Sequence, residues 1–187
     1  MKHHIPEEPM EKLAVSVRLA TSSPEDLEAF KELRHLALTG KDSEMFGMSS
    51  HPEQVEEERN RTDLELSENK FIVLSFESSR AIGIGIARKR EKEDDWWMGA
   101  GYIREDCRGR GIGKKMFAKR LQEIINRGGR KVTLAVKAVN AKSIHIAESF
   151  GFKKVDEGAS DEGFYMQLEN VNNPEVVKKI NEVLNAG

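Results

Sequence analysis

The residues with the clearest chemical potential form a short basic, glycine-rich segment, Arg108-Gly109-Arg110-Gly111-Ile112-Gly113, between a predicted strand and a predicted helix. The first amide N–H groups of a helix are unpaired and carry a partial positive charge. Glycines let an anion approach these amides without obstruction, and Arg108, Arg110 and Lys114 add full positive charge. The segment is therefore predicted to bind a phosphorylated ligand.

The spacing of the glycines excludes two common phosphate-binding loops. A Walker loop ends in Gly-Lys-Ser or Gly-Lys-Thr, whereas Gly113-Lys114 is followed here by Lys115. A dinucleotide loop needs Gly-x-Gly-x-x-Gly, and counting from either Gly109 or Gly111 leaves the last position without a glycine. The pattern thus favours neither a nucleotide hydrolase nor a dinucleotide-dependent enzyme.

The elements that must position this loop follow from the periodicity of the apolar residues. Three central strands are joined by short turns, so we expect an antiparallel meander ahead of the loop. The predicted order is a strand at 16–20, a helix at 24–40, a polar helix at 53–63, strands at 71–76, 81–87 and 96–103, a helix at 112–127, a strand at 131–136, a helix at 141–150, a strand pair at 152–155 and 164–168, and a helix at 174–184.

Length and composition indicate one globular unit. The chain has 187 residues, of which 38% are apolar and 33% charged, and its net charge is −2. This length suits one well-buried core rather than two. We expect a tail at 1–12, a single domain at 13–170 and an appended C-terminal helix at 171–187. Whether that helix docks on its own domain or on a second subunit, as in a homodimer, is left open.

Cysteine usage and hydropathy indicate a cytoplasmic protein. A single cysteine, Cys107, allows no disulfide within one chain, and no apolar run approaches the roughly 20 residues needed to span a membrane. The N-terminal residues lack the apolar region of a secretory signal, so we expect no membrane association. The basic loop after Cys107 is expected to lower the pKa of its thiol, but no base is spaced to activate it. We assign it no role.

Charge distribution argues against nucleic-acid and metal binding. From Arg104 to Lys131 there are ten basic residues against three acidic ones, but they cluster at a helix N-terminus without interleaved aromatic residues. His3 and His4 are too few to form a metal site. We therefore expect no nucleic-acid partner and no metal.

The spacing Arg-x-x-Gly-x-Gly, at Arg108, Gly111 and Gly113, resembles the acyl-coenzyme-A signature of the GNAT superfamily of N-acyltransferases. The resemblance covers roughly residues 14–169, including the order of the predicted elements, and identifies no subfamily.

A second segment strengthens the resemblance. Asn140-x-x-Ser143, followed by Gly151-Phe152, is similar to a later motif of the same family. The resemblance implies a mixed α/β (α+β) fold, with a central, mostly antiparallel sheet that is splayed at the cofactor strand and flanked by helices.

The resemblance also implies which residues bind the cofactor. In the family, a β-bulge before the loop exposes backbone groups that pair with the pantetheine arm and polarise the thioester carbonyl, while the loop amides hold the pyrophosphate. Acetyl-CoA would be the co-substrate, without a metal. The implied cofactor-binding residues are Gly101, Tyr102, Ile103, Arg108, Gly109, Arg110, Gly111, Ile112, Gly113, Lys114, Asn140 and Ser143.

The catalytic residues depart from the family pattern. A tyrosine that often protonates the leaving thiolate stands seven residues after the asparagine, and Ala147 occupies this position here. The thiolate would then leave unprotonated, or take a proton from water or from another residue. Tyr102 and Tyr165 are candidate donors, and we select Tyr102 as the catalytic candidate. The acidic turn Glu93-Asp94-Asp95 precedes the cofactor strand, so Asp95 is the candidate base that neutralises the attacking amine. A solvated turn is the simpler explanation of these carboxylates.

The resemblance implies an N-acetyltransferase that moves an acetyl group from acetyl-CoA to a primary amine of a small-molecule or peptide acceptor, by direct attack in a ternary complex. The alternative is a weakly active or inactive domain that binds or senses acyl-CoA, which Ala147 favours. Glu56, Glu57 and Glu58 lie on the helix expected to wall the acceptor pocket. They would attract a cationic amine, or simply form a solvated helix face.

Overall fold

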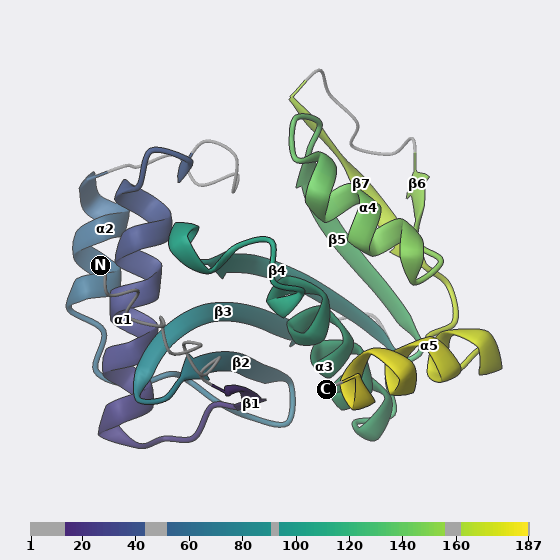
Figure 1. Ribbon diagram of the computed structural model, residues 1–187, viewed down its shortest axis with the longest axis horizontal. Helices are drawn as coiled ribbons and strands as arrows, with labels where there is room; N and C mark the ends of the chain where they lie inside the picture. Colours follow the sequence, from purple (N-terminus) through teal and green to yellow (C-terminus); the bar gives the residue numbers. More distant parts are fainter. Residues whose placement is uncertain (1–13, 44–51, 91–93, 156–161, 187) are drawn as a thin grey trace, which may run out of the picture.

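The computed structural model describes residues 14–43, 52–90, 94–155 and 162–186 (Figure 1). Its strands form a mixed sheet in the order β1-β2-β3-β4-β5-β7-β6, with β4 and β5 parallel and the other neighbours antiparallel. The strands are β1 (Val15–Leu19), β2 (Lys70–Glu77), β3 (Arg80–Lys89), β4 (Asp95–Ile103), β5 (Lys131–Lys137), β6 (Lys153–Val155) and β7 (Gly163–Leu168).

Helices cover both faces of this sheet. They are α1 (Pro24–Thr39), α2 (Pro52–Arg59), α3 (Ile112–Asn126), α4 (Ala141–Ser149) and α5 (Pro174–Asn185), with a short 3₁₀ turn, η2 (Glu105–Cys107), before the glycine-rich loop. Figure 1 shows α1 and α2 side by side at one end of the molecule, with β5, β7 and α4 at the other. The predicted α/β fold, its antiparallel meander and the order of its elements are confirmed.

Two hydrophobic clusters lie on opposite sides of the sheet. The smaller joins α1 to β2, β3 and the end of β4, through residues such as Phe30, Ile72 and Tyr102. The larger joins α3, α4 and α5 to the other side, through residues such as Leu121 and Trp96. Alternating side-chain direction along β4 therefore sends neighbouring residues into different cores.

The C-terminal helix packs on its own domain. Val176, Ile180 and Val183, which recur at helical spacing, are all buried in the larger cluster against α3. The chain entering α5 is held by Asn172, whose side-chain amide donates to the carbonyl of Gly129 at 3.1 Å. The apolar face of α5 is thus used within the protomer.

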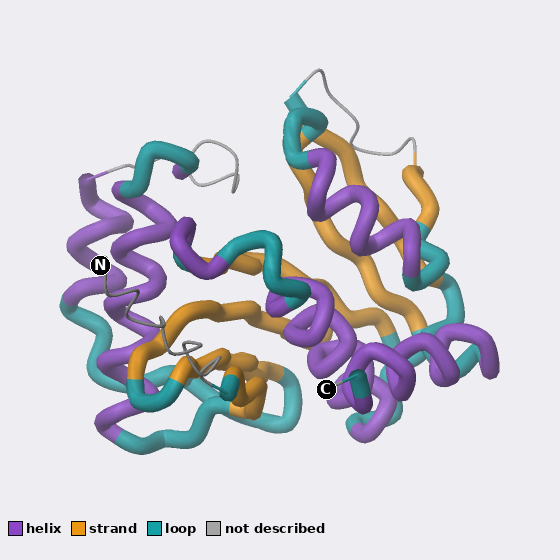
Figure 2. Tube along the Cα trace, viewed as in Figure 1, coloured by secondary structure: helices purple, strands orange, loops and turns teal. Residues whose placement is uncertain are grey.

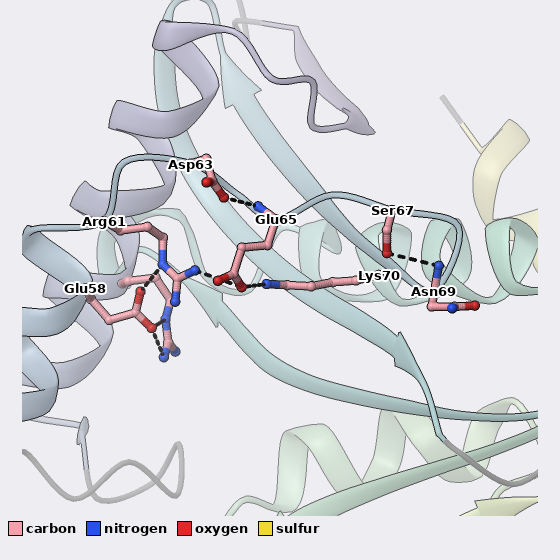
Figure 3. Close-up of polar contacts among 8 residues, drawn as sticks. Glu58, Arg61, Asp63, Glu65, Ser67, Asn69 and Lys70 are labelled. Carbon is pink, nitrogen blue, oxygen red and sulfur yellow. Dashed lines mark hydrogen bonds and ion pairs between the residues drawn. The ribbon is translucent and has the colours of Figure 1, made fainter.

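The polar helix α2 ends at Arg59, four residues before the predicted end at 63. The chain beyond it turns back, so that the guanidinium of Arg61 contacts Glu58 at 3.0 Å and Glu65 at 3.2 Å (Figure 3). Glu58 also accepts from Arg34 of α1 at 2.9 Å. The interpretation of Glu58 as part of a solvated face is wrong, because these two arginines bury it between α1 and α2.

A buried carboxylate fixes the start of α1. Asp26 is fully buried, accepts from both terminal nitrogens of Arg18 at 2.7 and 2.8 Å, and accepts from the amide of Thr21 at 2.7 Å. Its own amide donates to the N-cap hydroxyl of Ser23 at 3.2 Å. The hydrogen bond from Arg18 outweighs burial and lowers the pKa of Asp26 to about 2.

Replacing Asp26 with Asn should lower the free energy of unfolding at pH 7 by about 2 kcal/mol, the stability that such a depressed pKa contributes. A carboxyl group whose pKa is lowered in the folded state stabilises the fold at pH values above its unfolded-state pKa, near 4. This contribution is lost as the pH falls through the folded-state pKa of about 2. The difference between wild type and D26N in urea unfolding should therefore shrink over this window. Glu25→Gln, an exposed change in the same helical turn, is the control, and an equal loss there would contradict the assignment.

Candidate active site

The site is built around a separation of two parallel strands. β4 and β5 pair from Asp95–Lys131 to Met98–Leu134 and then stop, although both strands continue. β4 stays with β3 as far as Gly83–Ile103, whereas β5 stays with β7. Figures 1 and 2 show the two strands together near α5 and apart at their other ends. The predicted splay at the cofactor strand is therefore present.

A β-bulge bends β4 where the two strands separate. The register passes from Ile86–Gly99 to Ile84–Tyr102, so β4 contains one more residue than β3 in this interval. Ala100 has a positive φ of 49°, which is uncommon for a residue with a side chain. The bulge lies directly before Gly101, Tyr102 and Ile103. By the family resemblance, the backbone groups of these residues are expected to pair with the pantetheine arm.

The glycine-rich loop, at the carboxyl end of β4, presents the amides that precede the first helical hydrogen bond of α3. Gly111 is the N-cap of α3 with φ 76°, and no side chain caps the helix. The first helical bond runs from the amide of Lys115 to the carbonyl of Gly111 at 3.1 Å, so the amides of residues 112–114 precede the helical bonding pattern. Gly109 also has a positive φ, of 79°. This arrangement suits an anion, as the sequence predicted.

The arginine side chains of the loop do not extend into open space. Arg108 donates to the carbonyl of Ile103 at 3.0 Å and contacts Asp42 at 2.5 Å, and this hydrogen bond lowers the pKa of Asp42. Arg110 contacts Glu77 at the end of β2, also at 2.5 Å. Both residues tether the loop to neighbouring segments. Lys114, the third predicted cation, is half-buried and lies in the first turn of α3.

The first turn of α3 lies beside Ile146, in the second half of α4. A Cβ placed on Gly113 would lie 3.7 Å from the Cδ1 atom of Ile146. Asn140 caps α4, because its side-chain oxygen accepts from the amide of Ser143 at 3.2 Å. Ala147 is fully buried, so the position at which relatives often carry a tyrosine faces the core. The glycine-rich loop follows β4 and Asn140 follows β5, and because these strands are parallel, both segments lie at one end of the sheet.

The two candidate catalytic residues stand at opposite ends of β4. Tyr102 is 8% exposed, with its ring 5.8 Å from the guanidinium of Arg108, and burial raises its pKa. Asp95 lies 3.5 Å from Arg90 and accepts from the hydroxyl of Thr133 at 3.4 Å. Gly101 stands six positions further along the strand, or roughly 20 Å away. Asp94 is exposed beside it, and Glu93 lies outside the described residues.

The pKa of the buried Cys107 thiol is raised, whereas the sequence predicted a lowered value. Cys107 is 1% exposed, and its burial, followed by the nearby charge of Asp106, raises its pKa. The expectation that the basic loop lowers this pKa is wrong, because burial of the thiol and the negative charge of Asp106 outweigh the nearby cations.

Sequence reasoning missed Arg120, a residue of α3 that lies beneath the bulge. It is 7% exposed, and its Nη1 atom donates to the carbonyl of Gly99 at 3.3 Å. The signal was its spacing, since Arg120 stands four residues after Met116 and four before Ile124 on the apolar stripe of the helix. A charge on that stripe has to be buried when the helix packs.

Comparisons with known proteins agree with this geometry. Residues 31–152 match the model of the acetyltransferase (GNAT) family. No curated protein sequence matched the chain. The chain therefore belongs to the GNAT acetyltransferase family, as its motifs predicted.

Solved structures share the fold at low sequence identity. PaiA N-acetyltransferase from Thermoplasma acidophilum, in complex with coenzyme A, is 18% identical with a TM-score of 0.65, over 82% of this chain and 99% of that one. yncA from Salmonella typhimurium, solved with acetyl-CoA, is 17% identical with a TM-score of 0.63, over 86% and 95%. The ribosomal-protein-alanine N-acetyltransferase from Brucella melitensis is 20% identical with a TM-score of 0.60, over 82% and 99%.

The described residues contain no cluster of histidine, cysteine, aspartate and glutamate that could hold a metal ion. Among the helices formed by these residues, none has the length and apolar character required to cross a membrane.

Replacing Gly111 with Ala should lower the free energy of unfolding by about 1 kcal/mol, because φ is 76° there and a Cβ is strained in this conformation. No atom within 4 Å would obstruct the new methyl group, so the loss isolates backbone strain. Gly113→Ala is the matched control: this glycine lies inside α3, and its added Cβ would make ordinary contact with Ile146. Equal stability losses in urea unfolding would contradict this account.

Proposed function

We propose that this protein is an N-acetyltransferase that transfers an acetyl group from acetyl-CoA to a primary amine of a small-molecule or peptide acceptor. The observation that supports this most strongly is the separation of β4 from β5 beyond Met98–Leu134, with the uncapped N-terminus of α3 beside it. Together they offer a slot for an extended thioester arm and a set of amides for its pyrophosphate.

The amides of residues 109–114 would hold the pyrophosphate, with Lys114 adding charge. The pantetheine arm would lie along β4 at Gly101–Ile103, where β5 no longer competes for backbone hydrogen bonds. Asn140 and Ser143, at the start of α4, would border the arm from the other side of the opening. PaiA and yncA, which share the fold, were solved with coenzyme A and acetyl-CoA.

The reaction follows from bringing the two substrates together in the opening. The neutral amine attacks the thioester carbon, a carbon–nitrogen bond forms, and the carbon–sulfur bond breaks to release the thiolate. Positioning and polarisation of the carbonyl by backbone N–H groups supply most of the acceleration. Since Asp95 lies roughly 20 Å along the strand from Gly101, we assign removal of the amine proton to water in the opening.

We assign proton donation to the leaving thiolate to Tyr102. Burial raises the pKa of its hydroxyl, so Tyr102 is neutral at physiological pH and acts as an acid rather than a base. Ala147 cannot supply a proton from α4. The reaction draws on acetyl-CoA, and we place it in the cytoplasm, in keeping with the single cysteine.

Replacing Tyr102 with Phe should lower kcat by about a hundredfold, the usual contribution of a general acid, and leave KM for acetyl-CoA unchanged. Steady-state kinetics with the best amine would measure both constants. The other tyrosine of the chain, Tyr165 on β7, is 40% exposed, and Tyr165→Phe should retain full activity. Equal activity of Y102F and wild type would remove Tyr102 from the mechanism.

A second candidate function is acyl-CoA sensing, which the buried Ala147 at the family tyrosine position favours. Release of free coenzyme A from acetyl-CoA, followed with a thiol reagent across a panel of polyamines, amino acids, lysine peptides and peptide amino termini, separates the two. The enzyme proposal expects amine-dependent thiol release and an acetylated product detectable by mass spectrometry. Tight binding of acetyl-CoA without thiol release with any amine would instead establish the sensor.

A further inference from the structure

Arg120 is a buried cation without a carboxylate among its hydrogen-bond partners in the described part of the chain. It is 7% exposed, and its Nε atom has no hydrogen-bond partner there. Burying a charge without a counter-ion is costly, and an apolar residue of similar length would pack at this position on the stripe of α3. Stability therefore does not explain why an arginine stands here.

The sheet is shaped to accept this guanidinium. A Cβ placed on Gly85 of β3 would lie 2.8 Å from the Nε atom of Arg120, and one placed on Gly101 of β4 would lie 3.5 Å from Nη2. Any side chain at Gly85 would displace the arginine. The small residues of both strands thus leave space for the cation directly under the bulge.

The guanidinium contacts the backbone at the bulge itself. Nη1 donates to the carbonyl of Gly99 at 3.3 Å and is also 3.5 Å from the carbonyl of Ile86, the β3 residue that pairs with Gly99. The carbonyl of Gly99 therefore lies on the β3 side of β4. The peptide bond is trans, so the N–H of Ala100 is directed to the opposite side, where β5 has separated.

We propose that Arg120 is a positioning residue for acetyl transfer: it fixes and polarises the Gly99–Ala100 peptide, so that the N–H of Ala100 donates to the thioester carbonyl oxygen. This inference rests on the proposed function. As the amine adds to the carbonyl carbon, the oxygen gains negative charge, and a peptide held by a cation at its carbonyl end stabilises that charge without reorganisation.

The charge state of Arg120 is compatible with this role. Burial lowers its pKa to about 10, so the guanidinium remains charged at physiological pH. The Cζ atom of Arg120 lies 5.5 Å from the centroid of the Phe117 ring. This cation–π contact stabilises the guanidinium without neutralising its charge. The charge therefore remains available to the peptide above it.

The test compares Arg120→Met, Arg120→Lys and wild type in complex with acetyl-CoA labelled with ¹³C at the carbonyl. Isotope-edited infrared spectroscopy reports the polarisation of that carbonyl in the bound state and needs no acceptor. Calorimetry with acetyl-CoA and thermal melting accompany it. Lys119→Met, which removes a cation from the next residue of α3, is the matched control.

We expect the carbonyl band of R120M to lie at higher frequency than in wild type, with acetyl-CoA affinity and melting temperature maintained. R120K should lie between them, and K119M should match wild type. With an accepted amine, kcat of R120M should fall by about tenfold, less than the loss of a direct oxyanion donor.

An unshifted band in R120M, or a melting temperature clearly below that of wild type, would show that Arg120 serves packing alone and would overturn the inference. These results would leave the proposed function intact. Wild-type protein that fails to bind acetyl-CoA would overturn both.

Discussion

Backbone hydrogen bonding between β4 and β5 ends at Met98–Leu134, and the site depends on this ending. Parallel strands satisfy their amides by pairing, and a strand that loses its neighbour exposes backbone groups that need another partner. Here the bulge at Ala100 turns β4 away while β5 remains with β7. As a result, the end of β4 no longer pairs with β5, and the proposed function uses its backbone groups to bind the extended arm of acetyl-CoA.

Ion pairs join the glycine-rich loop beside this separation to neighbouring segments. Arg108 ties the end of β4 to Asp42 after α1, and Arg110 ties the loop to Glu77 on β2. Two of the three cations expected to face an anion are therefore structural tethers, and the backbone amides carry more of the proposed binding. Glu58, between Arg34 and Arg61, anchors α2 to α1 in a similar way (Figure 3).

Arg120 differs from these stabilising ion pairs, because its burial opposes stability and the proposed function explains its position. Within the described part of the chain it has no counter-ion, unlike Glu58, and Gly85 and Gly101 leave room for it at the expense of side-chain packing. Residues that oppose stability are expected where a site needs fixed charge in a water-poor environment. The bulge, the two glycines and the arginine form one arrangement, because each makes space for or contacts the next.

The sequence alone determined the order of the elements, the meander and membership of the family, because these depend on local periodicity and glycine spacing. It also predicted that residues 108–114 bind a phosphorylated ligand. Tertiary structure decided where the long side chains go. Arg108 and Arg110 turn to acids more than thirty residues away, Glu58 is buried by α1, and Asp95 is separated from Tyr102 by the length of β4. In the sequence, Arg120 is one of several basic residues of a helix. Its hydrogen bond to the carbonyl of Gly99 forms only because α3 packs beneath the bulge. Such contacts join distant segments, and no local pattern encodes them.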